Sequence, residues 1–187
     1  AWQLSGGMRQ KLGLACALVT KPRLVLLDEP SVGVDPVSRA ELWALVAAIA
    51  GEGTAILWAT SNLDEAERFD RVLLLHEGRL IADGAPAALA GAMRGRVWRL
   101  ALAGTRARRV LAAALAAPDV IDATVQGASV RVVVSAGAPP PLRGVLAQIN
   151  QQPIVPAAPR LEDAFIAALG GARLPPSPLT EAYRDIA

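Results

Sequence analysis

Two neighbouring carboxylates at the end of an apolar run are the first residues whose pattern suggests chemistry. Residues 24–27 are continuously apolar, and Asp28 and Glu29 follow at once. A continuous apolar run is typical of a strand buried on both faces of a parallel sheet, so both carboxylates are predicted at the sheet's carboxyl edge. There Asp28 would hold Mg²⁺ through water, and Glu29 would orient or deprotonate an attacking water. Taken alone, the pattern also fits a strand followed by an acidic loop.

A glycine-rich helix start precedes this strand. Ser5 stands where the N-cap of a helix over residues 6–20 belongs, and Gly6 and Gly7 follow it. Glycines let backbone N–H groups approach an anion closely, the serine adds a hydroxyl donor, and the helix dipole favours negative charge. The pattern therefore predicts a phosphate contact, although a bare Ser-Gly-Gly more often marks an ordinary capped helix.

Helices alternate with apolar strands along the first half of the chain, which predicts an α/β layer that positions these groups. Asp35 and Pro36 mark one helix start, and a Glu77-Gly78 pair marks a hairpin turn. The predicted elements are helix 6–20, strand 24–27, a helix from Asp35-Pro36 to Gly51, strand 54–60, helix 63–69 and hairpin 71–82.

Apolar spacing also predicts which side chains are buried. Cys16 is expected to be a small core residue of the first helix, and Trp58 is expected to pack in the core. The expected apolar stripes are Met8, Leu12, Ala15 and Val19 on the first helix, and Leu42, Leu45, Val46 and Ile49 on the second.

After residue 93 the pattern changes to that of a small α+β domain over 94–171, followed by a proline-rich linker or tail over 172–187. Six arginines lie between Arg94 and Arg109; they favour a solvated face over a contact with anionic lipid or nucleic acid. The predicted elements are strand 97–102, helix 106–117, a hairpin of 120–126 and 129–135, a helix from 139 to 150, and a helix containing Leu161, Phe165 and Leu169.

Composition excludes several classes of protein. The chain has 187 residues, 53% of them hydrophobic, which is enough to bury a core and excludes overall disorder. One cysteine and one histidine exclude a disulfide framework and a cysteine-cluster or multi-histidine metal site. A net charge of +2 gives no reason to expect nucleic acid. No apolar run reaches the roughly 18 residues of a spanning helix, and no signal peptide is visible.

In this order the motifs closely resemble an ATP-binding cassette (ABC) ATPase over residues 3–90, about half of the chain. The Asp-Glu-Ala-Glu run at 64–67 and Leu161-Glu162-Asp163-Ala164-Phe165 resemble bacterial drug- or polyketide-export cassettes, and more narrowly the first cassette of a tandem exporter ATPase. The segments that match the ABC ATPase family are residues 4–10 (signature motif), 24–30 (Walker B), 31–35 (D-loop), 60–67 (switch region) and 76–84 (the hairpin after the switch region).

The resemblance implies that two cassettes sandwich two ATP molecules head to tail, with Mg²⁺ as a second cofactor. Ser5, Gly6, Gly7 and Gln10 would contact ATP held by the partner cassette, and Asp35 would cross the interface. Asp28 and Glu29 would serve this chain's own site. The implied partners are a second cassette, in the same or a tandem chain, and transmembrane permease subunits. The implied location is cytoplasmic and peripheral, on the inner face of the cell membrane.

Two departures from the family pattern limit this prediction. Neither lysine, Lys11 or Lys21, follows a glycine, so the Gly-x-x-x-x-Gly-Lys phosphate loop (Walker A) is missing. We therefore expect a truncated cassette, the C-terminal part of a P-loop domain, that binds ATP poorly and is inactive alone.

Ser61 stands where the family carries the switch histidine. A serine can donate a hydrogen bond but is shorter and never cationic, so this site is predicted to hydrolyse ATP slowly. The main prediction is the ATPase subunit of an exporter of drugs or other small molecules. The alternatives are a catalytically weak regulatory cassette that supplies its signature motif in trans, and a soluble ABC ATPase acting on ribosomes or DNA.

Overall fold

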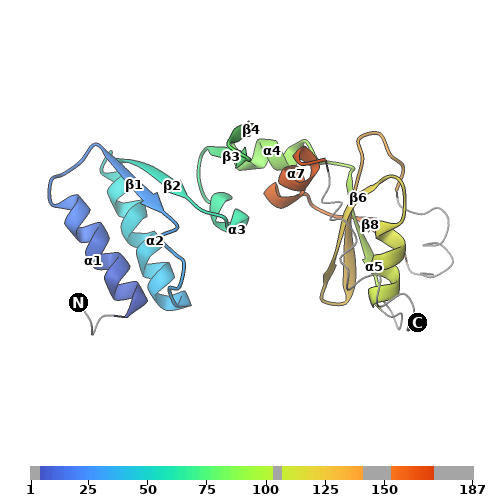
Figure 1. The fold of residues 1–187 in the computed structure, drawn as a ribbon, viewed down its shortest axis with the longest axis horizontal. Coiled ribbons are helices and arrows are strands. Elements are labelled where there is room, and N and C mark those ends of the chain that lie inside the picture. The colour runs from blue at the N-terminus through green and yellow to red at the C-terminus, as the bar shows by residue number, and fades with distance from the viewer. Residues whose placement is uncertain (1–4, 103–106, 141–152, 171–187) are drawn as a thin grey trace. The chain divides into compact units, whose positions relative to one another are not determined.

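A computed structural model describes residues 5–102, 107–140 and 153–170, and these fall into two compact units, Ala1–Leu63 and Asp64–Ala187. Figure 1 shows the elements of each unit. The expected linker over 172–187 and most of the helix expected over 139–150 lie outside the described residues. The fold is mixed α/β, as predicted: one unit has a parallel strand pair with helices, and the other has antiparallel strands with helices.

The first unit is a βαβ arrangement preceded by a helix. Strands β1 and β2 pair in parallel, in a register that sets Leu24 against Ala55 and Asp28 against Ala59. Both helices begin at the predicted caps, Ser5 and Asp35. The elements are α1 (Gly6–Leu18), β1 (Leu24–Asp28), α2 (Pro36–Gly51) and β2 (Ala55–Ala59).

The core of the first unit lies along α2. Leu42, Val46 and Ile49 are buried as predicted, but Leu45, the fourth residue of the predicted stripe, is exposed. Trp58 of β2 is buried too, and its ring stacks on Trp43 of α2 with the ring centroids 4.3 Å apart. Stacked aromatic rings bury a large apolar area, so this pair anchors α2 to the strand pair.

Three other burial predictions for this unit are wrong. Strand 24–27 is not buried on both faces: Val25 is buried, but Leu24 and Leu26, on the opposite face of β1, are exposed. The apolar stripe of α1 is not its buried face: Val19 is 80% exposed, while Gly7 and Leu14 are the buried residues of the helix. Cys16 is exposed rather than in the core. The physical reason for the α1 result is that the helix packs through Gly7 and Leu14, and Gly7 has no side chain for an apolar count to register.

The second unit begins within a short helix and contains a hairpin that turns where it was predicted to. Glu77 and Gly78 both have positive φ values, 47° and 73°, the backbone geometry of a tight two-residue hairpin turn. Neither α4 nor β8 was predicted. The elements are α3 (Leu63–Ala66), β3 (Val72–His76), β4 (Arg79–Gly84), α4 (Pro86–Gly91), β5 (Val97–Ala101), α5 (Ala107–Leu115), β6 (Val120–Gln126), β7 (Ser129–Val134), β8 (Ile154–Pro156) and α7 (Leu161–Ala168).

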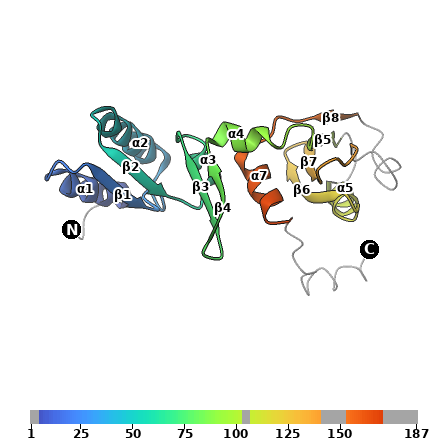
Figure 2. The ribbon, with the colours of Figure 1, turned by 90° about the horizontal axis from the view of Figure 1, so that it is seen from above.

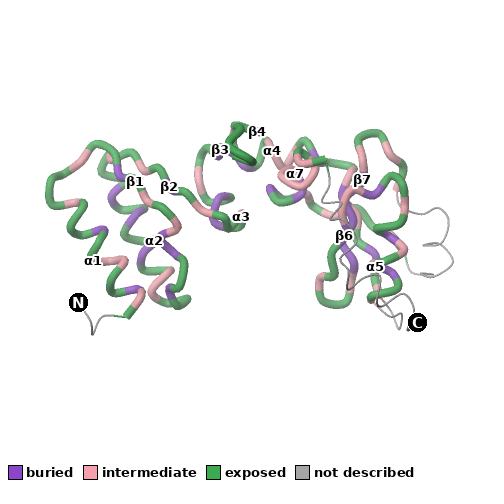
Figure 3. Tube along the Cα trace, in the orientation of Figure 1, coloured by how far each residue is buried: buried purple, intermediate pink, exposed green. Residues whose placement is uncertain are grey.

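A four-stranded antiparallel sheet of order β6-β7-β5-β8 forms the centre of this unit. Helix α5 packs on one face through the fully buried Val110 and Ala114, and α7 lies on the other side of the sheet (Figure 2). Alternation along β7 divides its side chains between these faces, which gives the continuous buried stretch in Figure 3.

Met93, the last residue of the predicted first domain, shares a core with residues of the predicted second domain. Met93, between α4 and β5, is 2% exposed and packs with Val97 and Val133. The two compact units divide the chain between Leu63 and Asp64. The division into domains 1–93 and 94–171 stays a prediction.

Candidate functional site

The parallel strand pair brings Glu29 and Ser61 together. Because Asp28 lies opposite Ala59, the residues after both strands leave the sheet at the same edge. The backbone N–H of Glu29 donates to the carbonyl of Ala59 (2.9 Å), and the backbone N–H of Ser61 donates to Oε1 of the Glu29 carboxylate (2.7 Å). One oxygen of the Glu29 carboxylate is thus fixed by the main chain of the loop that follows β2.

Glu29 also has an unusual backbone conformation. Its φ of 44° lies in the left-handed region, which costs an L-residue about 1–2 kcal/mol. The turn that follows holds it there, since the N–H of Val32 donates to the carbonyl of Glu29 (3.2 Å). Strained residues of this kind concentrate at functional sites, where the surrounding structure sets the direction of the side chain.

Asp28 ends β1 as an exposed carboxylate that forms no ion pair among the described residues. The described part of the chain holds no group of three or more His, Cys, Asp or Glu side chains suited to a metal ion. Mg²⁺ does not require such a cage, because it is commonly held by one or two carboxylates, waters and substrate phosphates. The chemistry of Asp28 therefore fits Mg²⁺ bound together with a nucleotide.

Ser5 caps α1 in the manner predicted for the phosphate contact. Its Oγ accepts a hydrogen bond from the backbone N–H of Met8 (3.2 Å), so its own hydroxyl hydrogen can be donated outward. Gly6 and Gly7 lie in the first turn, where backbone N–H groups have no partner within the helix. The start of α1 therefore offers several donors suited to an anion.

The two glycines also have a packing role. A Cβ at Gly6 would lie 2.9 Å from the carbonyl oxygen of Gly33, and one at Gly7 would lie 2.5 Å from Cβ of Ser38. Any larger residue would push the start of α1 away from the 31–38 segment. These glycines are therefore required by packing as well as by any phosphate contact.

Asp35 caps the neighbouring helix. Its Oδ1 accepts from the backbone N–H of Ser38 (2.9 Å), and this bond holds the pKa of Asp35 below its ordinary value of 3.8. Because the folded-state pKa is lowered, the cap stabilises α2 above about pH 3.8 and the contribution is lost as acid protonates Asp35. The exposed, ionised carboxylate therefore stands at the start of α2 at neutral pH.

Gln10 is half-buried on α1 and lines a cavity of about 240 Å³. Asp28 lines the same cavity, and the other lining residues are mainly apolar groups of α1, β1 and α2. The structure thus places Gln10 near the carboxyl end of β1.

Sequence reasoning missed a contact that begins in the switch region. Oε1 of Glu67 accepts a hydrogen bond from the backbone N–H of Leu161, the first residue of α7 (2.7 Å). The two residues are 94 positions apart, and no local pattern in the sequence indicates the pairing. It joins the two short motifs, 64–67 and 161–165, that suggested an export cassette.

Comparison with known proteins explains these motifs. A family model described as "ABC transporter" matches residues 1–32. The chain is 50% identical over 182 residues to the probable multidrug ABC transporter ATP-binding protein YbhF of Escherichia coli (strain K12), covering 96% of this chain and 31% of that protein. The chain is homologous to the ATP-binding proteins of ABC transporters. This confirms the family resemblance found in the sequence.

Other ABC relatives match mainly the first half of the chain. The daunorubicin/doxorubicin resistance ATP-binding protein DrrA of Streptomyces peucetius is 41% identical over 105 residues, covering 56% of this chain and 32% of DrrA. Nod factor export ATP-binding protein I of Neorhizobium galegae is 47% identical over 87 residues, covering 46% of this chain and 25% of that protein. The chain thus spans about a third or less of the length of these ABC proteins.

A solved structure of an ATP-binding subunit of an ABC transporter also resembles the chain. It is 34% identical, with a TM-score of 0.44, and the match covers 48% of this chain and 38% of that structure.

Proposed function

We propose that the complete protein is the ATP-hydrolysing subunit of an ABC exporter for drugs or other small molecules. The relatives support an exporter, since their names include multidrug transport, daunorubicin/doxorubicin resistance and Nod factor export. The observation that carries the catalytic part is the Glu29 carboxylate, held by the N–H of Ser61 at the carboxyl edge of a parallel strand pair.

When bound, ATP supplies the phosphoryl group that is transferred to water, and Mg²⁺ neutralises charge on its phosphates. Glu29 acts as the base or water-positioning group. Because Ser61 occupies one carboxylate oxygen, the other remains able to accept a proton from water. Asp28, beside it on the same edge, holds the metal through water.

Ser5, Gly6, Gly7 and Gln10 serve ATP bound to a second cassette, and Asp35 crosses between the two cassettes. The exposed caps of α1 and α2 support this role, because both present polar groups outward. No described helix has the length and hydropathy needed to cross a bilayer. We further propose that separate permease subunits hold this protein at the inner face of the cell membrane, since its relatives are named as the ATP-binding proteins of transporters.

Asp28→Asn in the complete protein tests the metal role. Asparagine keeps the size of the side chain but removes the charge. We therefore expect the Mg²⁺ concentration that gives half-maximal ATP hydrolysis to rise at least about tenfold. The measurement is the hydrolysis rate against Mg²⁺ concentration. The matched control is Asp70→Asn, an exposed aspartate outside the motifs. An unchanged Mg²⁺ requirement in Asp28→Asn would remove this residue from the metal site.

A second candidate function is the catalytically weak regulatory cassette, and Ser61 is the observation that favours it. The bond from position 61 to Glu29 uses the backbone, so Ser61→His keeps it and changes only an exposed side chain. If the missing imidazole limits this site, Ser61→His raises the steady-state ATPase rate roughly tenfold or more. Should Ser61→His and Glu29→Gln both hydrolyse ATP at the wild-type rate, this site makes no contribution to turnover.

A further inference from the structure

Two arginines face each other across strands of the second unit. Arg99 of β5 lies directly opposite Arg131 of β7 in the antiparallel register. Like charges in directly opposite positions destabilise a sheet. The pair therefore needs negative charge nearby, and within the described residues only one of the two arginines has it.

Arg131 is the arginine that is neutralised. Its Nε and Nη2 donate to the two carboxylate oxygens of Asp163 (3.0 and 2.5 Å), and Nη2 also donates to the carbonyl of Ala158 (2.7 Å). No carboxylate pairs with the side chains of Arg99 or Arg160 within the described part of the chain. Two exposed guanidinium charges thus remain uncompensated beside a buried, neutralised one.

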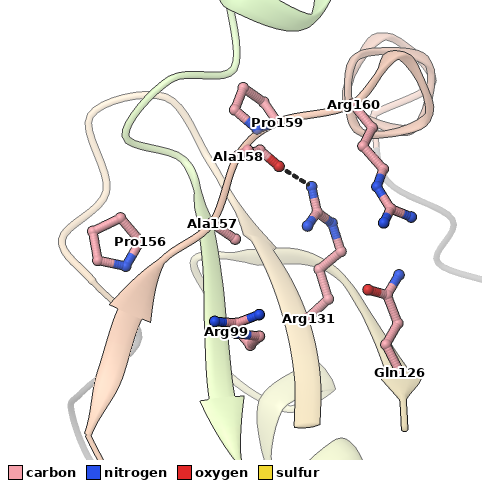
Figure 4. Close-up of a pocket in the computed structure, with 8 residues that line it drawn as sticks. All are labelled: Arg99, Gln126, Arg131, Pro156, Ala157, Ala158, Pro159 and Arg160. Atoms are coloured by element: carbon pink, nitrogen blue, oxygen red, sulfur yellow. Dashed lines mark hydrogen bonds between the residues drawn. The ribbon is translucent and has the colours of Figure 1, made fainter. Parts of the chain in front are cut away.

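These three arginines line one cavity of about 290 Å³ (Figure 4). Gln126 of β6 and residues 156–160 complete the lining, which contains no aspartate or glutamate. In this view the guanidinium of Arg131 lies between those of Arg99 and Arg160, and the Gln126 amide points toward the same space.

We propose that this pocket binds a small molecule through a carboxylate or phosphate group. Guanidinium forks match the planar geometry of a carboxylate and the oxygens of a phosphate, and they bind both by charge-assisted hydrogen bonds. Arg99 and Arg160 contact the anion, Arg131 stays locked to Asp163 as a fixed wall, and Gln126 sets the orientation. The volume is near the lower end of the range for small-molecule sites.

Titration calorimetry on the complete, nucleotide-free protein tests the site, with citrate and inorganic phosphate as separate probes. We expect the double variant Arg99→Gln/Arg160→Gln to bind the better probe at least about tenfold more weakly than wild type. The control, Arg108→Gln/Arg109→Gln, removes two arginines from α5 outside the pocket and should bind like wild type. Equal binding by wild type and the pocket variant, or binding of neither probe by wild type, overturns the proposal.

A stability measurement separates a binding role from a structural one. Arg99→Gln alone removes the like-charge pair, so we expect its ligand-free melting temperature to rise by about 1–3 °C while the shift caused by the probe is lost. A lower melting temperature would make Arg99 a structural residue. Sedimentation with phosphatidylglycerol vesicles is the last measurement. If vesicle binding depends on Arg99 and Arg160 while citrate and phosphate do not bind, the pocket binds a lipid headgroup. That result would overturn the proposal of a soluble small-molecule ligand.

Discussion

The complete protein carrying Glu29→Gln is expected to hydrolyse ATP at least about a hundredfold more slowly than wild type while still binding the nucleotide. The glutamine keeps the length of the side chain and an oxygen that can accept from the N–H of Ser61. It cannot accept a proton from water. The measurement is kcat at saturating Mg-ATP, with the nucleotide affinity determined separately so that the loss can be assigned to the chemical step.

Glu52→Gln is the matched control for this experiment, because Glu52 is an exposed glutamate of the same unit that follows α2. It should leave kcat unchanged. A wild-type rate for Glu29→Gln would show that hydrolysis takes place elsewhere in the complete protein, as the regulatory-cassette alternative requires. A large loss in both kcat and nucleotide affinity would instead indicate that the substitution disturbs the turn at Glu29.

Asp163→Ala is expected to destabilise the second unit by about 3–5 kcal/mol, because it leaves the buried guanidinium of Arg131 without its counter-charge. Asp163 also accepts from the backbone N–H of Arg160 (2.6 Å), so the start of α7 loses a partner as well. Hydrogen–deuterium exchange of the β5 and β7 amides is the appropriate measurement, since it reports on this sheet within a larger protein. The β5 and β7 amides of the variant should exchange at least about a hundredfold faster than those of wild type.

Replacing both charges provides the control. Arg131→Met with Asp163→Leu removes the ion pair but leaves no unpaired charge, so exchange in β5 and β7 should stay much closer to wild type than in Asp163→Ala. If the double variant is as unstable as the single one, packing at Asp163 rather than the unpaired charge accounts for the loss. If the β5 and β7 amides of Asp163→Ala are as protected from exchange as those of wild type, the prediction is wrong.

Local signals were sufficient to predict most element boundaries. Ser5 and Asp35 cap the helices that their side chains predicted, and Pro36 begins α2. The hairpin turns at Glu77-Gly78, because glycine accepts the positive φ of such a turn. The elements that escaped prediction, α4 and β8, are short, and their proline content weakens a periodic signal.

Burial and long-range pairing were harder to predict because they depend on neighbours distant in sequence. The apolar pattern of 24–27 predicted burial on two faces, but whether Leu26 is covered depends on which elements pack over its face of the sheet. The Glu29–Ser61 contact could be anticipated, since parallel strands end at one edge. The bond from Glu67 to Leu161 could not, because neither residue type indicates a partner.

Because Gly6 and Gly7 have no side chains, the start of α1 lies close to the 31–38 segment and the start of α2. With Gly7 against Ser38 and Gly6 against the carbonyl of Gly33, the first turn of α1 cannot shift without displacing that of α2. The ion pair of Lys11 with Glu41 joins the same two helices further along. The Ser5 hydroxyl and the Asp35 carboxylate thus belong to two helix starts that pack against each other through Gly7 and Ser38. A partner surface that docks on both caps must match both at once.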